Sequence, residues 1–318
     1  MGRNAGVGGQ RQADGMETKM RELWITSPAK INLTLEVLGR RPDGYHELDM
    51  LVVAVDLADR LRLVLRDDGA ITLSSSNGTL PLGEKNLAVA AARKLQAASG
   101  VRAGVHIEIE KRIPISAGLG GGSSNAAAVL MGLNALWGLG YDRERLQTLG
   151  AEIGSDVPFF FHGGTARVQG RGERVEPLPD VGPWTIVIAR PPLYVSTADV
   201  FRALAVDRLP PPGETAAAVA ALQAGRREAV LRHLRNDLEA VTFRLYPEVR
   251  RLKEKFYAFG AEYALMSGSG PVVYGVFPDG RRARRVVHSL RGFLRDVYLV
   301  QTLGARSSPR GMTAVSKG

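Results

Sequence analysis

Alternating apolar and polar residues mark the first part of the chain and predict β-strands. Residues 23–37 alternate in this way around a break at Pro28, which predicts two short strands or one bent strand. Lys30 and Asn32 fall on the same face of this segment, because successive side chains of a strand point to opposite faces. A lysine and an asparagine next to a proline break indicate either a pocket or ordinary solvated positions.

Elements of both types follow, separated by turns rich in glycine, proline and charged residues. Strands are predicted for residues 48–57, 61–66, 70–74, 104–113, 184–189 and 297–303. Helices are predicted for residues 86–98, 126–137, 142–153, 214–234, 247–259 and 281–290, and for a short segment that ends at Phe201. The sequence contains no internal repeat.

The most distinctive stretch is a glycine cluster between the strand at 104–113 and the helix at 126–137. Residues 114–125 are Pro-Ile-Ser-Ala-Gly-Leu-Gly-Gly-Gly-Ser-Ser-Asn, which predicts a flexible loop that becomes a capped helix at its Ser-Ser-Asn end. The first turn of a helix has unpaired backbone N–H groups and partial positive charge, and glycines let the backbone approach a ligand. Such a junction suits phosphate.

Two interpretations of this stretch remain: a phosphate-binding loop, or a glycine-rich turn that only caps a core helix. A lone glycine loop is weak evidence, but the flanking strand and helix supply the context that phosphate loops require. The hydroxyls of Ser123 and Ser124 add groups that can bond phosphate oxygens or a metal-bound water. We therefore favour phosphate binding.

Two further places carry candidate chemistry. Tyr45 and His46 directly follow a Pro-Asp-Gly turn, where they could hold a ring or pack on the fold as an ordinary pair. Asp156 lies between a glycine break and an apolar run, which indicates a partly buried carboxylate with a cationic or hydrogen-bonding partner. The alternative for Asp156 is an N-cap of a short helical turn.

Composition narrows the class of protein. The 318 residues suffice for two lobes, and 45% hydrophobic with 23% charged residues is ordinary for a globular enzyme. The absence of cysteine excludes disulfides, thiol nucleophiles and cysteine-ligated metal sites, and it fits the cytoplasm. The net charge of +10 suits anionic partners, yet no basic patch interleaved with aromatics predicts a nucleic-acid partner. No apolar run is long enough to predict a membrane span.

Both ends of the chain are expected to be disordered tails, at residues 1–20 and 305–318. The first tail is rich in Gly, Arg and Gln and has no apolar core, so it resembles neither a signal peptide nor an anchor. Met16 and Met20 lie just before the first strand, so either could be the natural start. Removing residues 1–19 should then leave activity intact.

Three motifs together resemble those of the GHMP kinase superfamily, over residues 25–304. They are Ser-Pro-Ala-Lys-Ile-Asn-Leu at 27–33, the glycine cluster with the alanines that follow it, and Met-Ser-Gly-Ser-Gly-Pro at 266–271. Gly-Ser-Asp-Val-Pro at 154–158 lies between the second and third motifs, and the joint order is highly specific. Arg-Pro-Asp-Gly-Tyr-His at 41–46 separates this member from mevalonate, homoserine and galactose kinases.

The resemblance implies a two-lobed α+β fold with the active site in the cleft between an N-terminal lobe, 21–183, and a C-terminal lobe, 184–304. It implies transfer of the ATP γ-phosphoryl group to the 2-hydroxyl of a cytidine-diphosphate-linked methylerythritol in non-mevalonate isoprenoid biosynthesis. Asp156 takes the role of base in the family pattern, and Lys30 lies close to it. Mg²⁺ is implied by ATP, although no Asp/Glu cluster predicts a protein-dominated metal site.

The same resemblance implies the remaining contacts. His46 is expected to recognise the cytosine edge, Tyr45 and Phe201 to stack on the two faces of the ring, and Asn32 and Thr197 to bond polar groups of the substrate. The residues expected to bind the ATP phosphates are Pro114, Gly118, Leu119, Gly120, Gly121, Gly122, Ser123 and Ser124. The third glycine motif contributes Gly268, Ser269 and Gly270.

The expected partner is a small molecule, and the chain is expected to act in the cytoplasm as a monomer or homodimer, without nucleic acid or membrane. Two alternatives stay open. One is a GHMP-type small-molecule kinase with a different alcohol acceptor, and the other is a basic nucleic-acid-binding protein. The latter predicts steeply salt-dependent DNA or RNA binding without ATP turnover.

Overall fold

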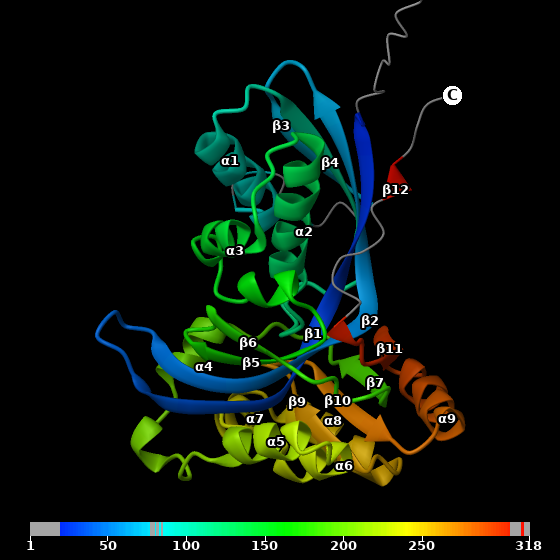
Figure 1. Cartoon of the computed structure of the whole chain (residues 1–318). Helices are drawn as coiled ribbons and strands as arrows, with labels where there is room; N and C mark the ends of the chain where they lie inside the picture. Colours follow the sequence, from blue (N-terminus) through cyan, green and yellow to red (C-terminus); the bar gives the residue numbers. More distant parts are fainter. Residues whose placement is uncertain (1–19, 77–79, 81–82, 84, 306–312, 315–318) are drawn as a thin grey trace, which may run out of the picture.

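The structure is a computed structural model of the chain, and it describes residues 20–76, 80, 83, 85–305 and 313–314. Two long antiparallel strands run through the molecule and belong to both of its halves (Figure 1). They are β1 (Glu22–Arg40) and β2 (His46–Arg66). One half of the molecule holds β3, β4 and helices α1 to α3, and the other holds most of the remaining elements.

The first sheet contains the order β12-β1-β2-β4-β3, with β5 on β2, β6 on β5, and β8 on β1. Its further strands are β3 (Ile71–Ser75), β4 (Gly104–Glu110), β5 (Thr165–Gly170), β6 (Arg174–Leu178), β8 (Arg235–Asn236) and β12 (Thr313–Ala314). The helices in the half of the molecule with β3 and β4 are α1 (Leu87–Ser99), α2 (Gly121–Leu136) and α3 (Arg143–Ala151). They pack together, and α2 also lies against β1 and β2.

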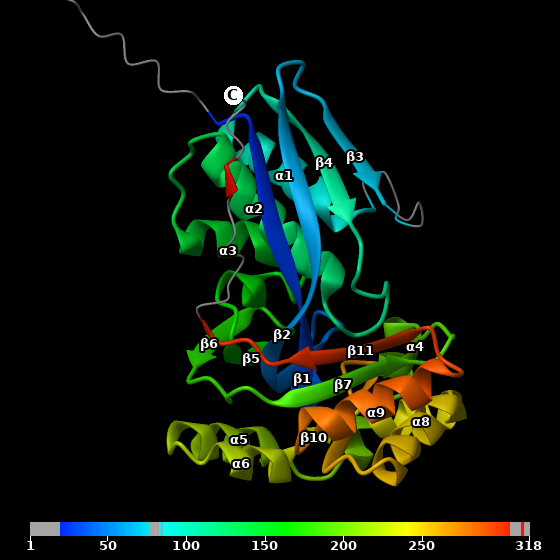
Figure 2. The same cartoon turned by 90° about the vertical axis from the view of Figure 1, so that its right-hand side faces the viewer.

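The second sheet is antiparallel, in the order β11-β7-β10-β9. Its strands are β7 (Thr185–Arg190), β9 (Tyr263–Met266), β10 (Val273–Phe277) and β11 (Asp296–Gln301). The helices of this half are α4 (Thr197–Arg202), α5 (Glu214–Gln223), α6 (Arg227–Val230), α7 (Glu239–Leu245), α8 (Pro247–Ala258) and α9 (Gly280–Arg291). Helix α8 packs on β9 and β10, and α9 packs on β7 and β11; Figure 2 shows both helices in the half of the molecule that holds this sheet.

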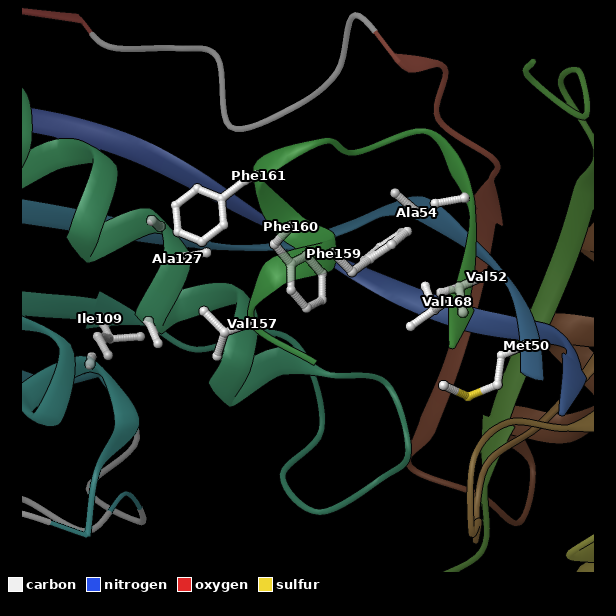
Figure 3. Close-up of a cluster of buried hydrophobic side chains, with 14 of the residues drawn as sticks. Met50, Val52, Ala54, Ile109, Ala127, Val157, Phe159, Phe160, Phe161 and Val168 are labelled. Carbon is white, nitrogen blue, oxygen red and sulfur yellow. The ribbon is translucent and has the colours of Figure 1, made fainter. Parts of the chain in front are cut away.

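Two buried clusters hold these layers together. One lies where β1 and β2 meet the second sheet, and Ile31, Val53, Ile188 and Tyr274 are among its members. The other surrounds α1 to α3 and continues to helices α8 and α9 of the other half. Three phenylalanines of the short 3₁₀ turn Pro158–Phe161 enter this second cluster, as Figure 3 shows, and they anchor the segment that follows Asp156.

The first two strands differ from the expected pattern in one respect. β1 is one bent strand, with a shift of register between Pro28 and Ala29, as one of the two alternatives predicted. β2 is also continuous, so the predicted turn between residues 57 and 61 is wrong. Two charged residues there have partners: Asp59 is fully buried against Lys111, and the guanidinium of the exposed Arg60 lies 4.6 Å from the centroid of the Trp24 ring.

Three further predictions need correction. Helix α2 begins at Gly121, five residues before the predicted start, and its N-cap is Gly120, so the Ser-Ser-Asn cap is wrong. Helix α7 was not predicted. In the C-terminal tail, Thr313 and Ala314 pair with β1, so disorder is wrong at these two residues.

Two further residues of the predicted tails, Met20 and Ala305, are described, and the Ala305 backbone N–H donates to Asp180 Oδ1 at 2.8 Å. The other tail residues, and with them the proposed start at Met16, lie outside the described residues. Met20 is the first residue that the structure describes. The division into lobes at 183/184 remains a proposal.

Candidate active site

A cleft of about 830 Å³ opens where β1, the start of α2, the β5–β6 hairpin, α4 and the β9–β10 loop meet. Eleven of the residues predicted from sequence line it: Lys30, Asn32, Tyr45, His46, Gly118, Ser123, Asp156, Thr197, Phe201, Gly268 and Ser269. They come from segments up to 239 positions apart in the chain, so the fold gathers them. Pro114, Leu119, Gly120, Gly121, Gly122, Ser124 and Gly270 do not line this cleft.

A lysine and an aspartate face each other in the cleft. The Lys30 ammonium lies 3.5 Å from the Asp156 carboxylate and donates a hydrogen bond of 2.8 Å to Asn32 Oδ1. The Lys30 side chain is only 7% exposed, whereas that of Asp156 is 38% exposed. Lys30 is therefore held in place inside the protein, while the carboxylate remains open to a ligand. The predicted proximity of these two residues is present in the fold.

Asn32 and its neighbours are fixed by a buried network. The Asn32 backbone N–H donates to Ser267 Oγ at 3.3 Å, and its carbonyl accepts from the Tyr274 hydroxyl at 3.0 Å. Its side-chain amide lies 3.3 Å from Met50 Sδ. The strand face that sequence alone left open between solvent and a pocket is thus the wall of the cleft.

The second and third of the three motifs, the glycine cluster and residues 266–271, contact each other. The Ser267 hydroxyl donates to the Gly118 carbonyl at 3.0 Å. Gly118 has φ +76°, and a Cβ on it would lie 2.3 Å from the Ser267 carbonyl oxygen. Gly268 has φ +58°, and a Cβ on it would lie 3.4 Å from Gly118 Cα. Only glycine fits this approach, because a side chain would both strain the backbone and separate the two loops.

The start of α2 faces this junction without a side-chain cap. Its N-cap, Gly120, has φ +67°, and a Cβ there would lie 2.9 Å from the Phe160 ring and 3.0 Å from Lys30 Cγ. The first backbone N–H groups of a helix have no partner within the helix, and they carry partial positive charge. A ligand with negative charge fits this end of α2.

The two serines of the first turn have different surroundings. Ser123 lines the cleft. Ser124 is fully buried, and its hydroxyl lies 2.7 Å from that of Ser27, so it is engaged within the core. Leu119 is also buried and contributes its carbonyl, which accepts from the Lys30 backbone N–H at 3.0 Å.

Aromatic side chains form the other end of the cleft. The rings of His46 and Phe201 stack with centroids 4.9 Å apart and an interplanar angle of 30°. Tyr45 is 54% exposed, and its ring faces the Arg171 guanidinium at 5.4 Å instead of Phe201. The Thr197 hydroxyl bonds that of Ser269 at 2.7 Å, which links α4 to the third glycine motif.

The charge state of His46 follows from its surroundings. Burial, reinforced by the positive charge of Arg40, lowers the pKa of His46 below its ordinary value of 6.5. The neutral imidazole, with one donor and one acceptor nitrogen, is therefore the dominant form at neutral pH.

Sequence reasoning missed several residues of the cleft. Arg40, Met50, Ser155 and Arg171 line it as well. Gly170-Arg171-Gly172 has the composition of a turn, but nothing in the sequence places it against Tyr45, 126 positions earlier. In the described part of the chain, no group of three or more His, Asp or Glu could hold a metal ion. Likewise, no helix among the described residues is long and apolar enough to cross a bilayer.

Family profiles match both halves of the chain. The profile of the GHMP kinases N terminal domain matches residues 86–164, and that of the GHMP kinases C terminal matches residues 218–296. The first segment contains the glycine loop and Asp156, and the second contains the third glycine motif. Fold and cleft together are those of an ATP-dependent kinase of the GHMP type, with two lobes and α+β architecture.

Individual relatives narrow the class further. A 4-diphosphocytidyl-2-C-methyl-D-erythritol kinase of Shouchella clausii is 49% identical over 279 residues, 88% of this chain and 94% of that protein. The protein of the same name from Geobacillus kaustophilus is 49% identical over 287 residues, 90% of this chain and 99% of its own. The crystal structure of a 4-(cytidine 5'-diphospho)-2C-methyl-D-erythritol kinase has a TM-score of 0.73 at 38% identity, covering 88% of this chain and 99% of that one.

The chain therefore belongs to the family of 4-diphosphocytidyl-2-C-methyl-D-erythritol kinases. The resemblance carried by the three motifs is confirmed.

Proposed function

We propose that this chain transfers the γ-phosphoryl group of ATP to the 2-hydroxyl of 4-diphosphocytidyl-2-C-methyl-D-erythritol, giving the 2-phosphate and ADP in non-mevalonate isoprenoid biosynthesis. The pairing of Lys30 with Asp156 carries the proposal, because it places a cation 3.5 Å from an exposed carboxylate. The cleft that holds this pair also lies at the N-terminus of α2, which has no side-chain cap. The names of the relatives support the choice of acceptor.

The triphosphate has a fitting place at the glycine loop. The N-terminus of α2 offers backbone N–H groups and partial positive charge, and Ser123 adds a hydroxyl. The glycines at 118 and 120 have positive φ and leave no room for a side chain, because Ser267 packs against the first, and Phe160 and Lys30 pack against the second; this packing fixes the loop at the start of α2. Oriented donors of this kind stabilise the charge that develops on the phosphoryl group during transfer.

Proton removal falls to Asp156 in this proposal. Its carboxylate accepts the proton of the attacking hydroxyl, while the Lys30 ammonium stabilises negative charge on the phosphoryl group in transit. The hydrogen bond from Lys30 to Asn32 fixes the position of the ammonium. Because phosphoryl transfer depends mostly on positioning and electrostatics, this fixed geometry is itself a large part of the catalysis.

Mg²⁺ accompanies ATP, and the cleft fits an ion held mainly by phosphate oxygens and water. Asp156, Ser123 and Ser155 provide oxygen donors on its wall, which is the ligand type that Mg²⁺ prefers. When bound, the ion neutralises negative charge on the phosphates.

The nucleoside of the acceptor fits the aromatic end of the cleft. A neutral His46 offers one donor and one acceptor to the cytosine edge. Stacking of cytosine between Tyr45 and Phe201 requires the His46 ring to leave the face of Phe201 that it now covers. Asn32 and Thr197 are proposed to bond polar groups of the acceptor. The enzyme is proposed to act in the cytoplasm, where its co-substrate ATP is made, as a monomer or homodimer.

The test is ADP formation by the purified chain with ATP and one of several acceptors. We expect turnover with the cytidine-diphosphate-linked methylerythritol, and none above background with mevalonate, homoserine or galactose. Asp156→Asn should lower kcat by about 10²–10⁴-fold, the usual contribution of a general base. Asp68→Asn, at an exposed pair with Arg66, is the matched control and should leave kcat unchanged. Equal turnover of another acceptor would identify a different GHMP-type kinase.

A further inference from the structure

Arg171 lies in the cleft without a role in the chemistry described so far. It stands at the tip of the β5–β6 hairpin and lines the cleft together with Tyr45 and Asp156. Its guanidinium covers the exposed ring of Tyr45 at 5.4 Å, and Nη2 lies 3.4 Å from the Ala151 carbonyl. The side chain therefore extends from the end of α3 to the aromatic end of the cleft.

The hairpin tip is built to hold this side chain in one place. The Arg171 backbone N–H donates to Glu173 Oε2 at 2.8 Å, which closes the turn. Gly170 and Gly172 have φ of +76° and +124°, and a Cβ on Gly172 would lie 3.1 Å from the Ser155 carbonyl. The tip thus packs on the residue next to Asp156. Arg171 consequently lies between the ring of Tyr45 and the segment that carries the carboxylate.

The charges around the cleft leave Arg171 available to an anion. Lys30 faces Asp156, and Arg202 is paired with Asp199 at 2.8 Å. Asp43 interacts electrostatically with Arg171, but it accepts a hydrogen bond from Arg41, at 3.1 Å. Among the described residues, no carboxylate lies within 4.0 Å of the Arg171 guanidinium, and its one hydrogen bond to protein, at 3.4 Å, is long. A guanidinium has five N–H donors in a planar fork, which matches two phosphate oxygens at once.

We propose that Arg171 is a specificity residue that binds the diphosphate of the acceptor. The inference rests on the proposed function, because that acceptor carries a diphosphate between its cytosine and the hydroxyl that Asp156 serves. If cytosine lies at Tyr45 and the hydroxyl lies at Asp156, the diphosphate must pass the position that Arg171 occupies. A bidentate contact there orients the acceptor, and the cation over the Tyr45 ring holds that ring ready for stacking.

The affinities of two probes, CDP and cytidine, measure the contribution of the diphosphate to binding apart from that of the nucleoside, and the measurement needs no turnover. By calorimetry, the wild type should bind CDP about 10- to 100-fold more tightly than cytidine, the range for a hydrogen-bonded charge. Arg171→Met removes the charge and keeps a long apolar side chain over Tyr45, so it should abolish most of this preference. Arg171→Lys keeps the charge without the fork and should retain part of it.

Arg174→Met is the matched control. This arginine lies three residues further along the same hairpin, is paired with Glu47 at 2.7 Å and does not line the cleft. It should keep the wild-type preference for CDP. In steady-state kinetics, Arg171→Met should raise KM for the acceptor and leave KM for ATP unchanged.

Two outcomes distinguish failure of this inference from failure of the proposed function. If Arg171→Met retains the full preference for CDP, or loses CDP and cytidine binding equally, the assignment of Arg171 is wrong, whatever the enzyme phosphorylates. If the wild type fails to phosphorylate the acceptor yet shows a preference for CDP that depends on Arg171, the proposed function is wrong and the anion contact stands.

Discussion

Gly118→Ala should uncouple the two glycine loops that meet at the head of the cleft. The new Cβ would lie 2.3 Å from the Ser267 carbonyl oxygen, where ordinary contacts begin at 3.4 Å, so one loop must move by about 1 Å. Misplacement by about 1 Å can lower the rate roughly 100-fold when reacting groups depend on position. The left-handed backbone at φ +76° adds about 1–2 kcal/mol of strain for alanine. We expect kcat to fall about 100-fold, measured as ADP formation.

Gly138→Ala separates the clash from the strain. Gly138 follows the other end of α2 and has a similar φ of +64°, but nothing lies within 4 Å of the position of its Cβ. It should show the same loss of about 1–2 kcal/mol in unfolding free energy, measured by chemical denaturation, with kcat unchanged. If Gly118→Ala keeps kcat within about twofold of wild type, or if Gly138→Ala loses as much activity, the contact between the loops does not position the phosphates.

Three further predictions concern ionisable groups that are buried or partly buried. Asp59→Asn removes the carboxylate that accepts hydrogen bonds of 2.7 Å from its buried lysine partner and from the backbone, and should lower the unfolding free energy by about 3–5 kcal/mol; a much smaller loss in urea denaturation would contradict this. Burial opposes ionisation of Glu36, but three backbone N–H donors at 213–215 outweigh it and lower its pKa below 4.5. The stability that Glu36 contributes is therefore complete above pH 4.5 and lost as pH falls through the lowered pKa; a stability-against-pH curve that is identical for Glu36→Gln would refute this. Burial and a nearby arginine lower the pKa of His46 below 6.5. The KM for the acceptor should therefore be constant above pH 6.5 and rise as pH falls through the lowered pKa, while the KM for ATP does not change. The same rise in His46→Asn would exclude His46 as its cause.

Local sequence signals predicted most of the elements, and the family pattern predicted that the motifs meet. Strand alternation located β1 and a break at Pro28, with one bent strand as one of two alternatives, and turn signals located the glycine loops. The closeness of Lys30 and Asp156 came from the family pattern, because no local signal joins residues that far apart. All these predictions depend on short-range patterns or on the order of motifs, and a single sequence displays both.

Long-range partners explain the failures. The run at 57–61 has the charge of a turn, yet it continues β2 because Asp59 meets Lys111 from another strand end. Two glycines disfavour a helix, yet α2 starts among them; a Cβ on Gly121 would lie 3.0 Å from Ile113 Cγ2, so close packing with a distant segment excludes larger residues there. The stack of His46 on Phe201, and of Arg171 on Tyr45, likewise joins segments whose meeting no local pattern encodes.

The most direct test of the central claim follows the phosphoryl group itself. Phosphorus NMR of the reaction of ATP with 4-diphosphocytidyl-2-C-methyl-D-erythritol should show one new phosphomonoester, on the 2-hydroxyl, for each ADP formed. The same signal should appear at least about 100-fold more slowly with Asp156→Asn. Release of inorganic phosphate without a new ester, phosphorylation of a different hydroxyl, or product formation at the wild-type rate by Asp156→Asn would contradict the assignment of this cleft.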